Sequence, residues 1–296
     1  MRLHYYRRQG FKNFGDDLNP WLWRQLIPEL LDDNPDEMFV GIGTLLNSNL
    51  PNAATTVVFG AGAGYGNGGL PDMTRVWRVY CVRGPLTARV LGLPRDRSVT
   101  DSALCIREVW KGAPFVRKSQ WSFMPHAMHS QHSGWHDVCR SLGIGYIDPR
   151  NPVEEVLSAI QNSTVLLTEA MHGAVVADAL RVPWVPVRTE RRILEFKWHD
   201  WTQSLKLTYA PCRLWPVWQC PSGAHLVQQV RRWAKTLVVA RQLKKVMRHA
   251  RPVLSDRVVS QRAFEELMER LNLLKRDMAA MRTARPTPHA HGLRNG

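Results

Sequence analysis

The sequence lacks the features that mark membrane, secreted and metal-binding proteins. Its 296 residues contain no run of about 18 apolar residues, so we expect no membrane-spanning helix. The opening residues, MRLHYYRRQG, lack the apolar core of a secretory signal, which favours a cytoplasmic protein. The five scattered cysteines include no CxxC pair, as expected for packed thiols in a reducing compartment. Neither HExxH nor a comparable motif is present, so we expect no metal ion.

A dinucleotide-binding fingerprint is also missing. The glycine-rich run GAGAGYGNGG at residues 60–69 follows a predicted strand, but Leu70 and Pro71 continue it as a loop. A nicotinamide-binding motif would open directly into a helix. We therefore expect no cofactor, and a flexible loop that contacts a ligand fits this run better.

Positive charge is abundant but unevenly distributed. The formal net charge is +15, and residues 231–296 hold 16 Lys and Arg against 5 Asp and Glu. The first 230 residues hold 24 against 20. The sequence thus predicts a mildly basic globular body with a basic end, which argues against a uniformly basic nucleic-acid-binding fold.

Hydrophobic periodicity predicts an α/β protein. The expected strands are residues 2–6, 39–42, 56–59, 78–82, 99–101, 121–124, 145–147, 165–168 and 185–187. The expected helices are residues 21–31, 84–91, 134–142, 152–161, 172–180, 223–248 and 260–283. Two successive runs of alternating strands and helices indicate two Rossmann-like, doubly wound domains that face a cleft. In such folds ligands bind at the carboxyl ends of the strands.

We therefore expect four segments along the chain. The N-terminal Rossmann-like domain spans residues 1–114, and the second spans residues 115–222. A basic helical extension follows at residues 223–284, and the tail at residues 285–296 has the composition of a disordered segment.

The segment TVLLTEAMHGA, from Thr164 to Ala174, is the most informative for chemistry. An apolar strand runs into a short turn, and a helix begins near His172, between Met171 and Gly173. The amide hydrogens and dipole of a helix N-terminus suit a phosphate or carboxylate. Beside such an anion, His172 could transfer a proton. The alternative, that His172 caps the helix by bonding a backbone group, stays open.

Carboxylates follow two predicted strands of the first half. In the segment NFGDD, Gly15 lets the backbone approach a ligand closely. Asp16 or Asp17 could accept hydrogen bonds from sugar hydroxyls or act as a base. A turn followed by a helix N-cap explains the same residues. Asp101 stands at the exit of the predicted strand 99–101.

Cationic and histidine side chains stand at other strand exits. Arg83, in CVRGP, could hold a carboxylate or phosphate, although a surface ion pair is equally compatible. His126, in FMPH, follows the first predicted strand of the second half. Arg188 and Lys197 lie among aromatic residues that could contact a sugar or simply pack this segment.

Together these segments resemble the polysaccharide pyruvyl transferase family, particularly its ketal-forming exopolysaccharide branch. The matching motifs cover about residues 1–205 in order: Asn13–Asp16, Val58–Gly64, Val82–Gly84, Thr100–Asp101, Met124–His126, Met171–His172 and Phe196–Trp201. The resemblance implies a fold like the GT-B glycosyltransferases, with two Rossmann-like domains around a cleft. It also implies transfer of pyruvate from phosphoenolpyruvate to a sugar as a cyclic ketal, with release of phosphate.

The resemblance assigns roles to individual residues. We expect catalysis from His172, Asp16 and His126, donor binding by Arg83, Met171, Gly173, Arg188 and Lys197, and acceptor binding by Asn13, Asp16 and Asp101. One position departs from the family, which commonly has Arg-Leu-His where this chain has Ala-Met-His. Ala170 cannot hold the donor phosphate, so Arg188, Arg191 or Lys197 would supply the charge.

Other functions remain open at this level. A GT-B glycosyltransferase that uses a nucleotide sugar, or a catalytically silent homologue that binds an anion or a membrane, would share the same layout. The acceptor expected from the family is a glycan or a lipid-linked oligosaccharide. The basic end could accordingly bind anionic lipid at the inner membrane face. It could equally pack across both domains, since residues 260–283 carry an apolar stripe.

Overall fold

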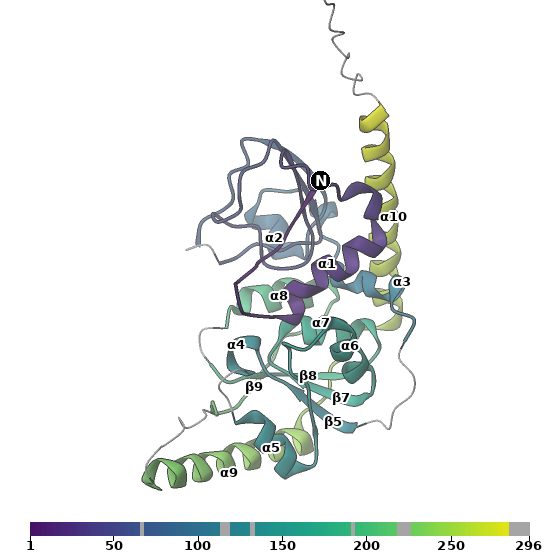
Figure 1. Ribbon diagram of the computed structural model, residues 1–296. Coiled ribbons are helices and arrows are strands. Elements are labelled where there is room, and N and C mark those ends of the chain that lie inside the picture. The colour runs from purple at the N-terminus through teal and green to yellow at the C-terminus, as the bar shows by residue number, and fades with distance from the viewer. Residues whose placement is uncertain (66–67, 113–118, 131–133, 191–192, 218–225, 284–296) are drawn as a thin grey trace, which may run out of the picture.

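The computed structural model describes residues 1–65, 68–112, 119–130, 134–190, 193–217 and 226–283, with side chains left out at 226–233. It contains two parallel β-sheets, and Figure 1 shows the second of them in the lower half of the molecule, with helices above it. The expected α/β class with two parallel sheets is confirmed. The expected boundary between residues 114 and 115 and the tail at 285–296 lie outside the described residues.

The first sheet has four strands in chain order. They are β1 (Arg2–His4), β2 (Glu37–Val40), β3 (Thr55–Phe59) and β4 (Val76–Cys81). No strand within the described ranges pairs with the free edge of β1, so this sheet is not doubly wound and that expectation is wrong.

The strand expected at residues 99–101 is also wrong. Ser98 forms only an isolated bridge with Val82, and Asp101 caps the 3₁₀-helix η4 (Ser102–Cys105). The Asp101 carboxylate accepts a hydrogen bond from the amide of Ala103 at 3.0 Å. A residue that caps a helix in this way favours a chain reversal over continued strand pairing.

The second sheet reverses direction. Its order is β6-β5-β7-β8-β9, and the bounds are β5 (Ser119–Met124), β6 (Gly145–Tyr146), β7 (Ser163–Thr168), β8 (Trp184–Arg188) and β9 (Cys212–Arg213). The chain leaves β5 for β6 on one side and returns to β7 on the other. Such a switch point opens a crevice at the carboxyl ends of the two neighbouring strands.

Four of the helices in the two lobes match expected ranges, those at residues 85–90, 135–142, 153–161 and 171–179, and three others were not expected. The helices are α2 (Pro85–Val90), α3 (Ile106–Val109), α4 (Ala127–Ser130), α5 (Trp135–Leu142), α6 (Val153–Gln161), α7 (Met171–Ala179) and α8 (Glu195–Ser204). Short 3₁₀ turns, η1 (Pro28–Leu30) and η3 (Arg95–Arg97), complete the first lobe. The agreement is closest where apolar spacing is regular, as in α5 and α6.

Helix α1 (Phe14–Leu26) begins seven residues before the predicted start at Trp21. Asn13 stands at its N-cap position, and Asp16 lies in the first turn, where the helix dipole favours negative charge. Pro20 lies inside the helix and has no N–H to donate to the carbonyl of Asp16. The side-chain amide of Asn19 donates to that carbonyl instead, at 3.3 Å. The segment NFGDD is therefore a helix start, not a loop.

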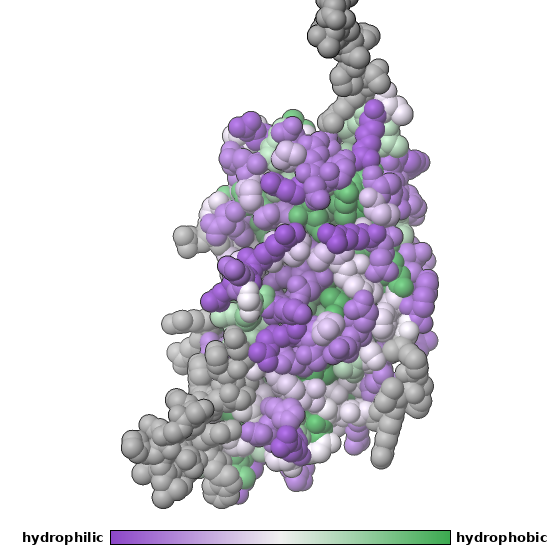
Figure 2. Space-filling view, viewed as in Figure 1, coloured by the Kyte–Doolittle hydropathy of each residue, from purple (hydrophilic) through white to green (hydrophobic). Residues whose placement is uncertain are grey.

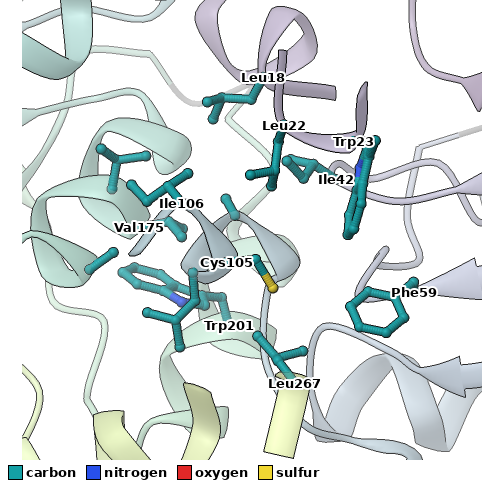
Figure 3. Close-up of a cluster of buried hydrophobic side chains, with 14 of the residues drawn as sticks. Leu18, Leu22, Trp23, Ile42, Phe59, Cys105, Ile106, Val175, Trp201 and Leu267 are labelled. Atoms are coloured by element: carbon teal, nitrogen blue, oxygen red, sulfur yellow. The ribbon is translucent and has the colours of Figure 1, made fainter. Parts of the chain in front are cut away.

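A continuous apolar core joins the two lobes. Figure 3 shows side chains from α1, η4, α7 and α8 meeting in one cluster, with Leu22, Cys105, Val175 and Trp201 among them. These side chains are almost wholly buried. The first lobe therefore packs on the second through hydrophobic contacts and not through a thin polar hinge.

The last two helices pack differently. Helix α9 (Leu226–His249) lies against α5 of the second lobe, and helix α10 (Arg257–Thr283) runs along the first lobe (Figure 1). In α10 the apolar stripe is buried, and Tyr80 of β4 donates a hydrogen bond to Asp277 at 2.8 Å. Across the described residues, no helix combines the length and hydrophobicity needed to cross a bilayer.

Candidate functional site

A cavity of about 1460 Å³ lies where the carboxyl ends of the two sheets approach each other. Its walls come from the segments after β1, β2, β5 and β7 and from the N-termini of α1 and α7. Six of the residues expected at the site line it: Asn13, Asp16, His126, Met171, His172 and Lys197. The face of the molecule in Figure 2 is mostly hydrophilic, with small hydrophobic patches. Polar side chains from both lobes therefore meet in one concave site.

His172 is the second residue of α7 and reaches toward the first lobe. Its imidazole lies directly on Gly15 of α1: a Cβ atom at position 15 would stand 2.1 Å from Nδ1. Only glycine leaves room for the ring at this distance. The predicted close approach at Gly15 therefore serves a histidine of the other lobe, and both residues line the cavity.

Asp101 stands behind the same imidazole. Its Oδ2 atom lies 3.6 Å from His172 Nε2, and both atoms are buried without a hydrogen-bond partner in the described structure. This separation is an electrostatic contact and is too long for a hydrogen bond. The Asp101 side chain is fully buried and does not line the cavity, so a direct contact with a glycan does not fit its position. Its carboxylate instead lies next to the imidazole of His172 inside the protein.

Asp16 faces the cavity from the first turn of α1. The side-chain amide of Asn13 donates to its Oδ2 at 2.6 Å. Burial raises the pKa of Asp16, although the Asn13 hydrogen bond and the nearby charges of His172 and Lys197 act in the opposite direction. A carboxylate with a raised pKa is a better proton acceptor than an ordinary surface aspartate.

Lys197 is the only cation among the predicted donor-binding residues that the described structure places in the cavity lining. It projects from α8, and its Nζ lies 3.1 Å from the hydroxyl oxygen of Tyr65. Ala170, at the N-cap of α7, also lines the cavity and brings no charge. Lys197 therefore fits the role of the cation that the sequence lacks at position 170. Arg191 lies outside the described residues.

Arg188 is held away from the cavity. Its Nε donates to the carbonyl of Glu190 at 2.8 Å, and its guanidinium forms an ion pair with Glu195. It is absent from the cavity lining, so the expected contact with a donor does not fit this position.

Arg83 is a structural residue in this fold. Its side chain is 0% exposed, and Nε donates to Asp200 of α8 at 2.9 Å. Its Nη1 donates to the hydroxyl of Thr44, which lines the cavity, at 2.8 Å. A Cβ at Gly62 would stand 2.0 Å from the guanidinium carbon, which explains the glycine there. Arg83 itself does not line the cavity, and its buried ion pair with Asp200 joins the two lobes while Nη1 contacts Thr44.

His126 lines the cavity in its neutral form. Burial and then the charge of Lys197 lower its pKa to about 4. Its backbone N–H donates to the buried carboxylate of Glu169 at 3.2 Å, and that carboxylate also accepts from His129 Nδ1 at 2.6 Å. Burial acts to raise the pKa of Glu169, but the hydrogen bond and charge of His129 prevail and lower it. A charged Glu169–His129 pair thus supports the loop that carries His126.

Gly173 does not line the cavity. A Cβ there would stand 2.7 Å from Met124 Sδ and 2.7 Å from the hydroxyl of Thr168. Glycine is needed at this position so that the first turn of α7 can pack on β5 and β7. Glycine at position 173 therefore allows close packing, while Met171 and His172 line the cavity.

Sequence reasoning missed several lining residues. Thr44 comes just after β2, so the rule that carboxyl ends of parallel strands share an edge would have found it. Arg2 of β1, Arg7 just after it and Arg24 of α1 also line the cavity, but no sequence motif links these three arginines. Among the described residues, no group of three or more His, Cys, Asp or Glu is arranged to hold a metal ion.

Comparison with known proteins agrees with this geometry. The sequence model of the family described as polysaccharide pyruvyl transferase matches residues 13–191, which include Asp16, His126 and His172. The chain is also similar to the succinoglycan biosynthesis protein ExoV of Rhizobium meliloti (strain 1021). The two are 40% identical over 213 residues, which cover 71% of this chain and 67% of that relative. With a family match over more than half of its length, the chain belongs to the polysaccharide pyruvyl transferase family and is a transferase.

Proposed function

We propose that this chain transfers pyruvate from phosphoenolpyruvate to a sugar of an exopolysaccharide or lipid-linked oligosaccharide. The product is a pyruvate ketal, and phosphate is released. Family membership supports pyruvate transfer, and the name of the ExoV relative supports an exopolysaccharide acceptor. The observation that carries the proposal is the convergence of His172, Asp16 and Lys197, from both lobes, on one cavity.

The proposed reaction needs proton transfers that these residues can supply. One sugar hydroxyl gives up its proton while its oxygen bonds to C2 of the donor, and the methylene carbon gains a proton to become a methyl group. The bond between C2 and the phosphate oxygen then breaks. The second hydroxyl closes the ketal at C2, and its proton leaves with the phosphate. The protons balance, so the protein only has to relay them.

His172 and Asp16 are the proposed relay. His172 is held between Gly15 and Asp101, and it protonates the methylene carbon. Asp16, with its raised pKa, accepts the proton of an attacking hydroxyl, while Asn13 holds its carboxylate in place. The neutral His126 orients the donor or acceptor through hydrogen bonds. The position of each side chain in the cavity lining supports its proposed role.

The donor is proposed to lie on the second lobe and the acceptor on the first. The N-terminus of α7, at Met171, offers amide hydrogens to the phosphate, and Lys197 supplies the cation. Asp16 and Asn13 lie on the first lobe. A cavity lined from both sheets supports the GT-B-like arrangement, with residues 1–114 as acceptor domain and 115–222 as donor domain.

The direct test is incubation with phosphoenolpyruvate and a lipid-linked oligosaccharide. We expect release of inorganic phosphate and a new methyl resonance of a ketal in the product. Turnover of a nucleotide sugar without consumption of phosphoenolpyruvate would indicate a glycosyltransferase instead. Binding of phosphoenolpyruvate without turnover would indicate a silent homologue, and either result would overturn the proposal.

We further propose peripheral contact with the anionic inner face of the membrane, through α9. This helix has seven Lys and Arg and no Asp or Glu, whereas α10 has six against four and is partly buried in the core. Leu237 and Val238 are 38% and 36% exposed on α9, and the neighbouring Trp215 is 58% exposed. Basic residues near a membrane surface contribute about 1 kcal/mol each. Exposed apolar and basic side chains on one helix suit an anionic bilayer.

Vesicle flotation tests this proposal. The chain should float with vesicles that contain phosphatidylglycerol and not with neutral vesicles. The double variant Lys244→Glu/Lys245→Glu should lose flotation, because both residues are exposed on α9. The double variant Arg262→Glu/Arg276→Glu makes the same charge change on exposed positions of α10 and is the control. Equal loss in both variants would show nonspecific attraction and reject the assignment to α9.

A further inference from the structure

The cavity has more room than the proposed donor requires. Its volume of about 1460 Å³ exceeds the roughly 300–1,000 Å³ of ordinary small-molecule sites. Phosphoenolpyruvate has only three carbons and one phosphate, and the residues proposed to hold it lie at α7 and α8. Much of the cavity therefore remains for the acceptor, and its lining should reflect the chemistry of that acceptor.

Three arginines of the first lobe line this cavity. Arg2 and Arg7 lie on and just after β1, the edge strand of the first sheet, and Arg24 lies on α1. We call these three residues the arginine wall. Within the described part of the chain, none of the three forms an ion pair with a carboxylate. Unpaired guanidinium groups that share a cavity wall are poised to bind an anion.

The charges of the arginine wall act within the cavity. His4, which lies between Arg2 and Arg7 in the sequence, has a pKa lowered by burial and then by these two arginines. Two carboxylates also line the cavity. Asp16 lies beside His172, and Asp33 is not paired with any arginine of the wall in the described structure. The wall thus keeps a net positive character.

Aromatic rings accompany the arginines. The guanidinium carbon of Arg7 lies 4.3 Å from the centroid of the Tyr5 ring, which limits the positions that this side chain adopts. Tyr6 also lines the cavity and is 56% exposed. An exposed tyrosine offers an apolar ring face and a hydroxyl, a combination that suits a sugar next to a charged group.

We propose that the arginine wall binds an acidic group carried by the acceptor glycan, namely a phosphate, a diphosphate or a carboxylate. This inference rests on the proposed function, because it assigns the occupant of the same cavity. The acidic group anchors the acceptor on the first lobe and leaves its reacting hydroxyls to be placed near Asp16 and His172. The enzyme therefore selects acceptors by charge, at a distance from the reacting atoms.

The test compares one oligosaccharide in three forms: neutral, with a diphosphate at its reducing end, and with a terminal uronic acid. The wild-type enzyme should show a lower KM for an acidic form than for the neutral form. Whichever acidic form is preferred identifies the source of the charge. In the double variant Arg2→Gln/Arg7→Gln, the KM for the preferred form should rise about 10- to 100-fold, while the KM for phosphoenolpyruvate stays unchanged. Arg89→Gln, at an exposed arginine of α2 outside the cavity lining, should behave as wild type.

A binding measurement separates this inference from the proposed function. Inorganic diphosphate is titrated calorimetrically into wild type, Arg2→Gln/Arg7→Gln and Lys197→Gln. Weaker binding in the arginine variant but not in the lysine variant supports the inference even if no pyruvate is transferred. Equal KM values for the neutral and acidic acceptors in wild type would overturn it, as would diphosphate binding that ignores Arg2 and Arg7.

Discussion

His172 is a residue of the second lobe whose surroundings belong largely to the first. Gly15 supports one edge of its ring, and Asp101 lies 3.6 Å from Nε2 at the other. Both supporting residues come from the first lobe, and the imidazole is only 15% exposed. The proton transfer that we propose for this group therefore requires both lobes in their observed arrangement.

Replacement of His172 tests its role directly. We expect His172→Ala to lower kcat about 100-fold or more, because the proton donor to the methylene carbon is lost. The assay is phosphate release from phosphoenolpyruvate in the presence of acceptor. His136→Ala is the matched control, since His136 is exposed on α5 and outside the cavity lining. A near-normal rate in His172→Ala would reject the assignment.

The raised pKa of Asp16 predicts how the reaction rate depends on pH. As a base it acts in the ionised form, and burial raises its pKa above the ordinary value of 3.8. The rate should therefore fall as pH decreases through this raised pKa, at a higher pH than an ordinary aspartate would give. In Asp16→Asn the rate should be low and this acidic limb should disappear. An acidic limb that persists in the variant would assign the titration to another group.

Charge at the residue scale was only partly predictable from sequence. Lys197 was expected to bind the donor and does line the cavity. Arg83 was expected there as well, but its partner Asp200 lies 117 residues further along the chain. The position of Arg83 after a strand predicts where its backbone lies, but not which carboxylate its side chain contacts. Long-range ion pairs of this kind are set by tertiary packing and leave no local pattern.

At the scale of elements, the N-terminus of α1 fixes the positions of two residues that line the cavity. The helix begins at Phe14, so Gly15 and Asp16 occupy its first turn and are fixed relative to α7. Asn19 strengthens this position, since its side chain also exchanges hydrogen bonds with the backbone of Ile42, at 2.9 and 3.0 Å. A rigid helix start gives Asp16 a definite distance from His172 that a loop would not.

The contact between α1 and α7 can be tested at Gly15. We expect Gly15→Ala to displace the His172 ring, because the new Cβ would meet Nδ1 at 2.1 Å. Activity should fall about 100-fold, as for a misplaced proton donor. Circular dichroism should show that the fold is retained. Gly92→Asn serves as control, because Gly92 has a φ of +63° and no atom within 4 Å of a Cβ. Full activity of Gly15→Ala would contradict the proposed geometry.

Elements with regular apolar spacing were predicted well, including β5, β7, α5, α6 and α7. The start of α1 was missed because the predicted helix 21–31 begins just after Pro20, whereas Pro20 stands inside the helix with Asn19 as a substitute donor. The expected strand at residues 99–101 failed because Asp101 caps a 3₁₀-helix. In both cases one polar side chain redirected the backbone against the apolar pattern.

At the scale of the whole molecule, α10 holds the two lobes as one unit. It buries Leu267, Leu271 and Leu274 in the core cluster that both lobes share. Beside it, Arg181 of the second lobe donates to the hydroxyl of Ser255 at 2.9 Å, just before α10 begins. The basic end of the chain is thus divided in function, with α10 as part of the core and α9 as an exposed helix.

This division predicts different costs for similar substitutions. Leu271→Ala in α10 should lower the free energy of unfolding by about 2–5 kcal/mol, because its side chain is buried. Leu237→Ala in α9 should change it by about 0.5 kcal/mol or less, since Leu237 is 38% exposed. Urea denaturation measures both. Similar values for the two variants would mean that α10 is not part of the cooperative core.

The sequence predicted two Rossmann-like sheets and two basic helices but not how these pieces join. Two packing outcomes for the basic end were compatible with the same apolar stripe. The choice depends on whether the first sheet has an uncovered face, which only the assembled fold reveals. The order of the first sheet was likewise beyond the reach of periodicity, since strand patterns do not specify neighbours.

The hydrogen bond between Tyr80 and Asp277 joins residues 197 positions apart. During synthesis, the first sheet emerges from the ribosome long before the helix that covers it. Until that helix has been made, the face that it will cover stays exposed in the nascent chain, where chaperones protect such surfaces from aggregation. Expression of the first lobe without α10 would leave that face exposed, so we expect such a fragment to aggregate.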